Sequence, residues 1–206
     1  DFSFHMGVTR YDDMAKCDFK EIVRRGVNSF KVFLAYKGAL GVNDEQLYKT
    51  LRLARSLGVI TTAHCENADL IAELQKKLIA EGKTGPEWHY WSRPPIVEAE
   101  GVHHLMTFAK LTDVHVYIVH LSCEEALREA IRGREHGVNV WVETLIQYLL
   151  LDLTEAEKSG FEGAKAVMSP PLRDNANRSI LWNALRQGMI ATLATDHAPF
   201  DFATKR

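Results

Sequence analysis

Residues Asn28–Lys37 (NSFKVFLAYK) have the pattern of a buried strand with a lysine near its centre. Lysine is almost never fully buried unless another group pairs with it. Burial disfavours the ammonium ion and lowers the pKa of Lys31, which makes a neutral, nucleophilic amine accessible. Such an amine can capture carbon dioxide as a carbamate, whose two oxygens can bridge two metal ions. The alternative is a lysine whose aliphatic stem passes Phe30 and Phe33 while its charge stays in water.

Similar apolar runs recur along the chain and alternate with helical patterns. Strands are predicted at 59–64, 116–120, 138–143 and 189–197, and the end of a further strand at 2–5. Helices are predicted at 13–25, 44–57, 68–80, 96–111 and 179–187, several of them followed by glycine. Alternating strands and helices indicate right-handed crossovers and a parallel sheet, and near-continuous apolar runs are typical of strands buried on both faces. The sequence therefore predicts an α/β fold.

Three local features refine this outline. Ser122 with Glu125, and Thr154 with Glu157, have the spacing of capping boxes that would begin two helices. Residues 169–173 (SPPLR) are expected to form an extended loop because of the two prolines. The aromatic segment 85–95 interrupts the alternation, either as a loop packed on the next helix or as the lining of a pocket or subunit contact.

Composition excludes several classes of function. The 206 residues are 46% hydrophobic and 25% charged, as in ordinary globular proteins. A formal net charge of −2 gives no electrostatic basis for binding nucleic acid or an anionic membrane. No apolar run has the length of a membrane span and no secretory signal pattern begins the chain. Three cysteines without a C-x-x-C pair indicate a reducing, cytoplasmic compartment.

Polar residues stand where the apolar runs end. His64, His120, Glu143 and Asp196 each close a different predicted strand. One histidine at a strand end is more often a rim residue than a ligand. In a β/α barrel, however, the carboxyl ends of the strands converge on one mouth, where the chemistry is located. Imidazole and carboxylate groups are ligands for zinc and related divalent metals. We therefore expect Lys31, His64 and His120 to converge on one point.

Six short segments carry these residues in order. They are 29–37 (SFKVFLAYK), 63–67 (AHCEN), 119–122 (VHLS), 143–144 (ET), 169–173 (SPPLR) and 195–200 (TDHAPF). Together, over essentially the whole chain, they resemble the dihydropyrimidinase/D-hydantoinase family of cyclic amidohydrolases, within the metal-dependent amidohydrolase superfamily.

The resemblance implies roles for particular residues. Two divalent metal ions, usually zinc, would be bridged by N6-carboxylated Lys31. His64 and His120 would ligate one ion, and Asp196 would ligate the other and shuttle protons. Tyr36 would hydrogen-bond the substrate oxyanion, and the backbone at Ser169 would hold the ring amide.

The resemblance also implies a (β/α)8 barrel of the TIM type. Residues 1–206 would be an internal part of it, from about the third strand to the eighth, with the first strands and the flanking β-sandwich absent. The chain departs from the family pattern in two further ways: it has no His-x-His pair for the second metal, and Leu145-Ile146 stands where relatives commonly have Cys-Pro. Taken alone, these residues are expected to be unstable or aggregation-prone and inactive.

The implied function is the ring opening of a small cyclic amide, a dihydropyrimidine or a 5-substituted hydantoin, by a metal-bridging hydroxide. A homo-oligomer, a tetramer by resemblance, is expected, with no nucleic-acid or membrane partner. Two alternatives are another cyclic amidohydrolase such as an allantoinase, and a non-enzymatic relative of the collapsin response mediator type. The second alternative is disfavoured because such proteins lack the metal ligands that this chain keeps.

Overall fold

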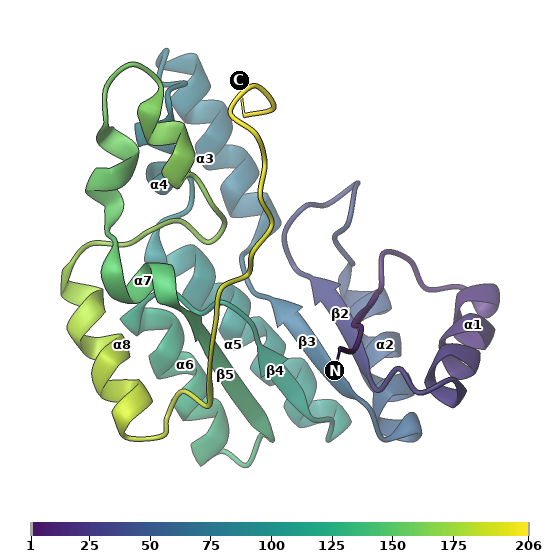
Figure 1. Ribbon diagram of the computed structural model, residues 1–206. Helices are drawn as coiled ribbons and strands as arrows, with labels where there is room; N and C mark the ends of the chain where they lie inside the picture. Colours follow the sequence, from purple (N-terminus) through teal and green to yellow (C-terminus); the bar gives the residue numbers. More distant parts are fainter. Residues whose placement is uncertain (1, 206) are drawn as a thin grey trace.

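A parallel sheet forms the centre of the molecule. The structure is a computed structural model that describes residues 2–205. Within this range six strands pair in sequence order, and every neighbouring pair is parallel (Figure 1). The strands are β1 (Met6–Gly7), β2 (Ser29–Phe33), β3 (Ile60–His64), β4 (Val116–Ile118), β5 (Val140–Leu145) and β6 (Thr192–Ala194). The α/β architecture expected from the sequence is confirmed.

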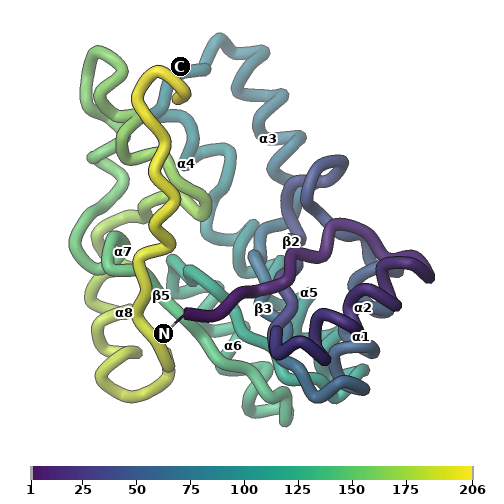
Figure 2. Tube along the Cα trace, turned by 45° about the vertical axis from the view of Figure 1, so that its right-hand side comes forward, coloured from purple at the N-terminus to yellow at the C-terminus, as the bar shows by residue number. Residues whose placement is uncertain are grey.

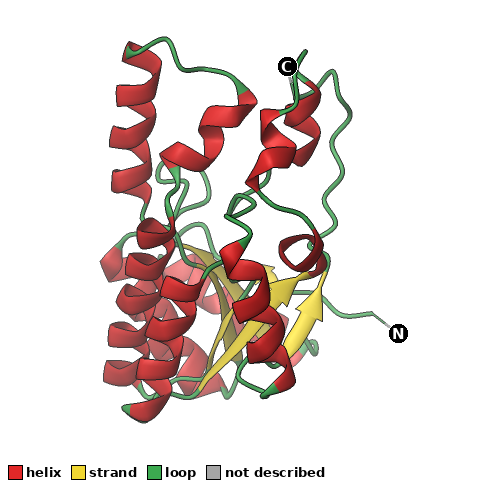
Figure 3. Cartoon of the chain, turned by 90° about the vertical axis from the view of Figure 1, so that its left-hand side faces the viewer, coloured by secondary structure: helices red, strands yellow, loops and turns green. Residues whose placement is uncertain are grey.

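The main helices connect successive strands and lie along one side of the sheet (Figure 3). They are α1 (Asp13–Arg24), α2 (Asp44–Leu57), α5 (Pro95–Thr112), α6 (Glu124–Glu135) and α8 (Ala176–Arg186). Local chemistry fixes their ends. In α2, Asn43 and Gln46 form a capping box, and Gly58 ends the helix in the left-handed conformation that glycine adopts without strain.

The remaining helical segments lie beyond the carboxyl ends of the strands (Figures 1 and 2). They comprise α3 (Ala68–Ala80), η1 (Pro86–Trp88), α4 (His89–Ser92), α7 (Ile146–Leu150), η2 (Leu153–Glu157) and η3 (Glu162–Ala166). The aromatic segment 85–95 is thus largely helical, and Pro86, Trp88 and His89 line a cavity of about 520 Å³ beside α3. Of the two interpretations, lining a pocket describes it better than a plain loop does.

The strand register separates two faces of the sheet. Phe30, Thr61 and Val116 form one row across neighbouring strands; all three are fully buried, and Phe30 packs against Phe19 of α1 at 5.4 Å between ring centroids. The alternate row runs through Lys31, Thr62, Tyr117 and Trp141. Since successive side chains of a strand point to opposite faces, this second row faces away from the helices. Trp141 keeps 39% of its surface exposed there.

The bounds of the first and last strands differ from those expected. The first strand is Met6–Gly7 rather than residues 2–5, because the pairing partners of Phe30 and Lys31 are Met6 and Gly7. The last strand is the core of the expected run, Thr192–Ala194.

Neither of the capping boxes is formed. Helix α6 begins after Cys123 without a side-chain cap, because the Ser122 hydroxyl donates to Glu98 instead. The second segment is a 3-10 helix capped by Asp152, whose carboxylate accepts from the Thr154 backbone N–H at 3.1 Å. No helix within residues 2–205 combines the length and apolarity needed to cross a membrane.

Candidate metal and substrate site

Two buried histidines face each other at the carboxyl ends of neighbouring strands. His64 is the last residue of β3, and His120 follows β4 by two residues. Nδ1 of His64 lies 2.9 Å from Nε2 of His120, and their side chains are nearly inaccessible to solvent. Burial lowers the pKa of both imidazoles well below the ordinary value, and the nearby positive charge of Lys31 lowers each pKa further. Burial therefore favours the neutral form of both rings.

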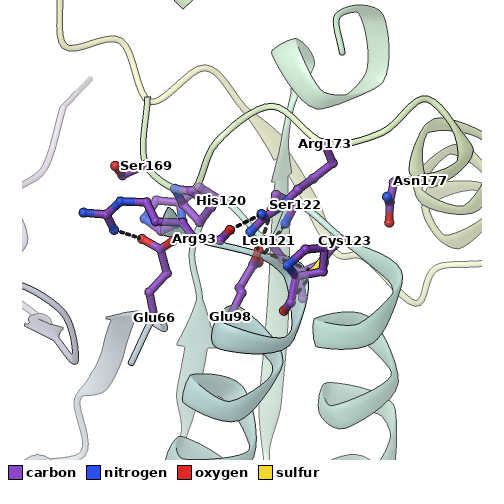
Figure 4. Close-up of polar contacts among 12 residues, drawn as sticks. Glu66, Arg93, Glu98, His120, Leu121, Ser122, Cys123, Ser169, Arg173 and Asn177 are labelled. Atoms are coloured by element: carbon purple, nitrogen blue, oxygen red, sulfur yellow. Dashed lines mark hydrogen bonds and ion pairs between the residues drawn. The ribbon is translucent and has the colours of Figure 1, made fainter. Parts of the chain in front are cut away.

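A buried carboxylate fixes the orientation of His64. Nε2 of His64 lies 2.7 Å from Oε2 of Glu66. Nη1 of Arg93 donates to the same oxygen at 2.7 Å (Figure 4). Burial raises the pKa of Glu66 and Arg93 opposes the rise. A carboxylate at Nε2 accepts the imidazole proton there, which leaves the lone pair of Nδ1 pointing toward His120.

His120 is held by its backbone. Its φ angle of +43° lies in the left-handed region, which non-glycine residues adopt only when the surroundings enforce it. Its N–H donates to Oε1 of Glu143 at 3.1 Å, and Oε2 of Glu143 accepts from the Tyr117 hydroxyl at 2.7 Å. Nδ1 of His120 is buried and has no hydrogen-bond partner within residues 2–205. Glu143 thus serves as a support for His120.

Lys31 lies on the same face of the sheet. Burial lowers its pKa to about 8, and the negative charges of Asp196 and Glu143 oppose this shift. Its Nζ is 5.1 Å from the centroid of the Phe33 ring. The largely buried amine that the sequence indicated is therefore present, close enough to lower the pKa of both histidines.

Tyr36 stands beside His64, in the loop after β2. Its ring centroid is 5.2 Å from that of His64, and its φ is +60°. Its carbonyl accepts the N–H groups of Ala39, Leu40 and Gly41. Gly41 leaves no room for a side chain, because a Cβ there would collide with the Ala35 carbonyl. This tight turn places the tyrosine at the site.

Ser169 begins the loop that was expected to hold substrate. Its hydroxyl lies 3.3 Å from Nε2 of His89, which donates to the Met168 carbonyl at 2.9 Å. The carbonyl of Pro170 accepts from the buried Tyr148 hydroxyl at 2.7 Å. The loop is therefore anchored at both sides of Ser169.

Asp196 is not brought into this cluster as a ligand. It is exposed, in the segment that follows β6, with φ +45°. Its proximity is seen in its electrostatic effects on the pKa of Lys31 and on the pKa of the buried Tyr148. Within residues 2–205 no group of three or more His, Cys, Asp or Glu side chains is gathered to hold a metal. The clustered groups are two imidazoles, which can bind a metal directly, and the Lys31 amine, which would bind one only after carboxylation.

The chemistry of this donor set fits a zinc-type ion. Two nitrogens bound tetrahedrally to zinc at about 2.0–2.1 Å would be about 3.3 Å apart, close to the 2.9 Å between Nδ1 of His64 and Nε2 of His120. The carboxylate on the far nitrogen of His64 is the usual support of a metal-binding imidazole. His64, His120 and Lys31 thus form the candidate metal centre.

Sequence reasoning missed the buried polar groups behind the site. These are Glu66, Arg93, Glu98, Ser122 and Arg173, joined by hydrogen bonds and ion pairs (Figure 4). Glu66, Ser122 and Arg173 lie within the quoted segments AHCEN, VHLS and SPPLR, so the motifs carried a signal for three of them. Nothing in the local sequence of Arg93 or Glu98 distinguishes them from surface residues.

The fold and site define a parallel β/α protein with two histidines at adjoining strand ends. Comparison with known proteins shows that the chain is homologous to D-hydantoinases and dihydropyrimidinases, which are cyclic amidohydrolases. The D-hydantoinase of Geobacillus stearothermophilus is 42% identical over 203 residues, or 98% of this chain and 43% of that protein. The dihydropyrimidinase of Arabidopsis thaliana is 37% identical over 207 residues, or 100% of this chain and 39% of that protein.

Solved structures agree. A D-hydantoinase (dihydropyrimidinase) from Thermus sp. superposes with a TM-score of 0.97 at 52% identity, and a dihydropyrimidinase from Brevibacillus agri with 0.96 at 43%. Each match covers 98% of this chain and 44% of the other. No protein-family model matches the chain. The chain spans less than half the length of these relatives, and over that length the resemblance seen in the motifs is confirmed.

Proposed function

We propose that this chain contributes to a metal-dependent enzyme that opens the ring of a cyclic amide, a dihydropyrimidine or a 5-substituted hydantoin. The observation that carries the proposal is the facing pair of buried nitrogens on His64 and His120, with Lys31 nearby. The names of the relatives supply the class of substrate.

The residues divide into holding and reacting groups. His64, His120 and N6-carboxylated Lys31 would hold two divalent ions, most often zinc, together with Asp196. Bound metal would supply the charge that activates water near neutral pH and would polarise the ring carbonyl. Tyr36 would donate its hydroxyl to the oxyanion that develops on the attacked carbonyl. Asp196 would carry a proton to the leaving nitrogen, and the backbone at Ser169 would orient the ring amide.

The exposed position of Asp196 bears on this assignment. A proton carrier must approach the reacting atoms, so Asp196 would have to be drawn toward Lys31 when metal and substrate are bound. The positive charge of the free Lys31 amine attracts Asp196, as the effect of Asp196 on the pKa of Lys31 indicates. Carboxylated Lys31 would be negative, so in the loaded protein the divalent ions would supply the attraction.

The test is a metal-replacement assay of ring opening. A protein that carries this chain at the full length of its relatives is stripped with a chelator. It is assayed on dihydrouracil and on a 5-substituted hydantoin, before and after addition of zinc and bicarbonate. We expect activity to vanish with the metal and to return with zinc plus bicarbonate. His120→Ala should abolish the zinc-dependent activity, whereas His103→Ala, an exposed histidine on α5, should not. Ring opening that survives complete metal removal would contradict the proposal.

A further inference from the structure

A buried ion pair stands directly behind the candidate metal centre. Arg93 and Glu66 are both almost inaccessible to solvent, and Nη1 of Arg93 donates to Oε2 of Glu66 at 2.7 Å. Replacing a buried ion pair by apolar residues is often neutral or stabilising, so the pair is a weak device for stability. Its position beside His64 points to a different role.

The first link runs through the side chain of Arg93. The Glu66 oxygen that it holds is the one that lies 2.7 Å from Nε2 of His64. The guanidinium therefore fixes the carboxylate, the carboxylate fixes the imidazole, and Nδ1 stays directed toward His120. Oε1 of Glu66 has no partner within residues 2–205, so the contacts on Oε2 alone hold this carboxylate.

The second link runs through the backbone of the same residue. The carbonyl of Arg93 accepts a hydrogen bond from Nη1 of Arg173, the last residue of the loop that begins at Ser169. Arg173 is itself buried and donates to Oε2 of Glu98 and to Oγ of Ser122, each at 2.8 Å (Figure 4). The end of the loop therefore cannot move without moving Arg93.

The start of the loop rests on the same segment. His89, four residues before Arg93, donates to the Met168 carbonyl and lies 3.3 Å from the Ser169 hydroxyl. Residues 89–93 thus touch both ends of the substrate loop and, through Glu66, the imidazole of His64. They connect the two halves of the site, which are the metal-binding histidine His64 and the loop 169–173.

We propose that Arg93 is a positioning residue that fixes the metal-binding His64 relative to the substrate loop 169–173. Its side chain acts on His64 through Glu66, and its carbonyl acts on the loop through Arg173. This proposal rests on the proposed function, because it assigns the loop to substrate and His64 to metal. It predicts that the two arms can be disturbed separately.

The test of the side-chain arm is zinc affinity, measured on the metal-free protein by competition with a chromophoric chelator. Arg93→Met keeps the length of the side chain and its backbone carbonyl but removes the guanidinium. We expect zinc to bind about 10–100-fold more weakly, as is typical when the support of a metal-binding histidine is lost. Arg93→Lys should recover part of the affinity.

The matched control is Arg134→Met. Arg134 donates to the carbonyls of Val140 and Met189, at 3.1 and 2.9 Å, near the amino ends of β5 and β6. Its loss removes a comparable set of hydrogen bonds away from the site, so zinc affinity should not change. Circular dichroism of each variant establishes that it is folded. If Arg93→Met does not fold, Glu66→Gln enters the same measurement in its place.

The backbone arm is tested by Arg173→Lys, which cannot make all three contacts of the guanidinium. We expect a raised KM for the cyclic amide with zinc affinity retained. A folded Arg93→Met or Glu66→Gln protein that binds zinc as tightly as the parent would overturn the positioning role while leaving the proposed function intact. A parent protein that binds no zinc at all would overturn both.

Discussion

His120 is held in an unfavourable backbone conformation that directs its side chain toward His64. A left-handed backbone at a non-glycine residue costs about 1–3 kcal/mol and persists only where its surroundings enforce it. Here the enforcement comes from Glu143, which accepts the His120 N–H, and from the Glu143 carbonyl, which accepts the Leu121 N–H at 2.8 Å. The Glu143 carboxylate of β5 therefore supports the conformation of His120.

This support can be tested with a pair of variants. Glu143→Ala removes the acceptor for the His120 N–H, and we expect the free energy of unfolding to fall by about 1–3 kcal/mol. Glu143→Gln retains a carbonyl oxygen in the same place and should lose less. Urea denaturation followed by circular dichroism measures both. Equal losses in the two variants would mean that the contact with the N–H does not matter.

The proposed role of Asp196 as a proton carrier can be tested directly. Asp196→Asn keeps the size of the side chain but removes its ability to carry a proton. We expect kcat for ring opening to fall far more than KM rises, because proton transfer belongs to the transition state. Steady-state kinetics on the zinc-loaded protein provide the measurement. Turnover close to that of the parent would show that another group carries the proton.

At the scale of elements, the sequence was informative where structure is local. The helical periodicity of α2 and α3 predicted both helices with their observed bounds, and the apolar runs located the strands. The strand-end pattern also predicted that His64 and His120 would meet. Long-range polar pairs could not be predicted, because Arg173 is 75 residues from its partner Glu98. Ser122 has the spacing of a helix cap, but its hydroxyl donates to Glu98 instead. A local rule fails where a distant partner competes for the same hydroxyl.

The packing of α5 on the end of β3 depends on a glycine. A Cβ on Gly101 would lie 2.6 Å from the backbone carbon of Cys65, directly between the two candidate site residues His64 and Glu66. Because backbone cannot move aside as a flexible side chain can, Gly101→Ala should push α5 away from the strand end. We expect clear destabilisation, of about 1–3 kcal/mol as for other overpacked sites, in thermal or urea unfolding.

Gly133 of α6 is the control for this prediction. The three atoms nearest to a Cβ there all belong to the side chain of Met106, with Sδ at 2.5 Å, and a methionine side chain can adjust. Alanine also favours the helix over glycine by about 1 kcal/mol. Gly133→Ala should therefore be close to neutral. If both variants lost the same stability, the close approach of α5 to Cys65 would not be the cause.

At the scale of the whole molecule, helices cover the two faces of the sheet unequally. The helices cover the face that carries Phe30 and Val116, whereas the face that carries Lys31, Tyr117 and Trp141 has no helix of residues 2–205 packed along it. Among these residues β1 and β6 are also the two edges of the sheet. The relatives extend well beyond the matched stretch, so in them further chain is available to cover the same surfaces.

This arrangement predicts the behaviour of residues 1–206 expressed by themselves. An uncovered edge presents unpaired N–H and C=O groups to other chains, and Leu193 on β6 adds an apolar side chain that is 47% exposed. We expect the isolated stretch to self-associate, as size-exclusion chromatography with light scattering would show, and to open no hydantoin ring with zinc and bicarbonate added. Leu193→Lys should reduce the association, because a charge on an edge strand opposes pairing with another chain. A lysine in place of Leu181, a fully buried residue of α8, would instead disrupt the core. Comparison of the two lysine variants therefore separates edge pairing from general unfolding. A monomeric, cooperatively folding and active product would show that the six strands need no further covering.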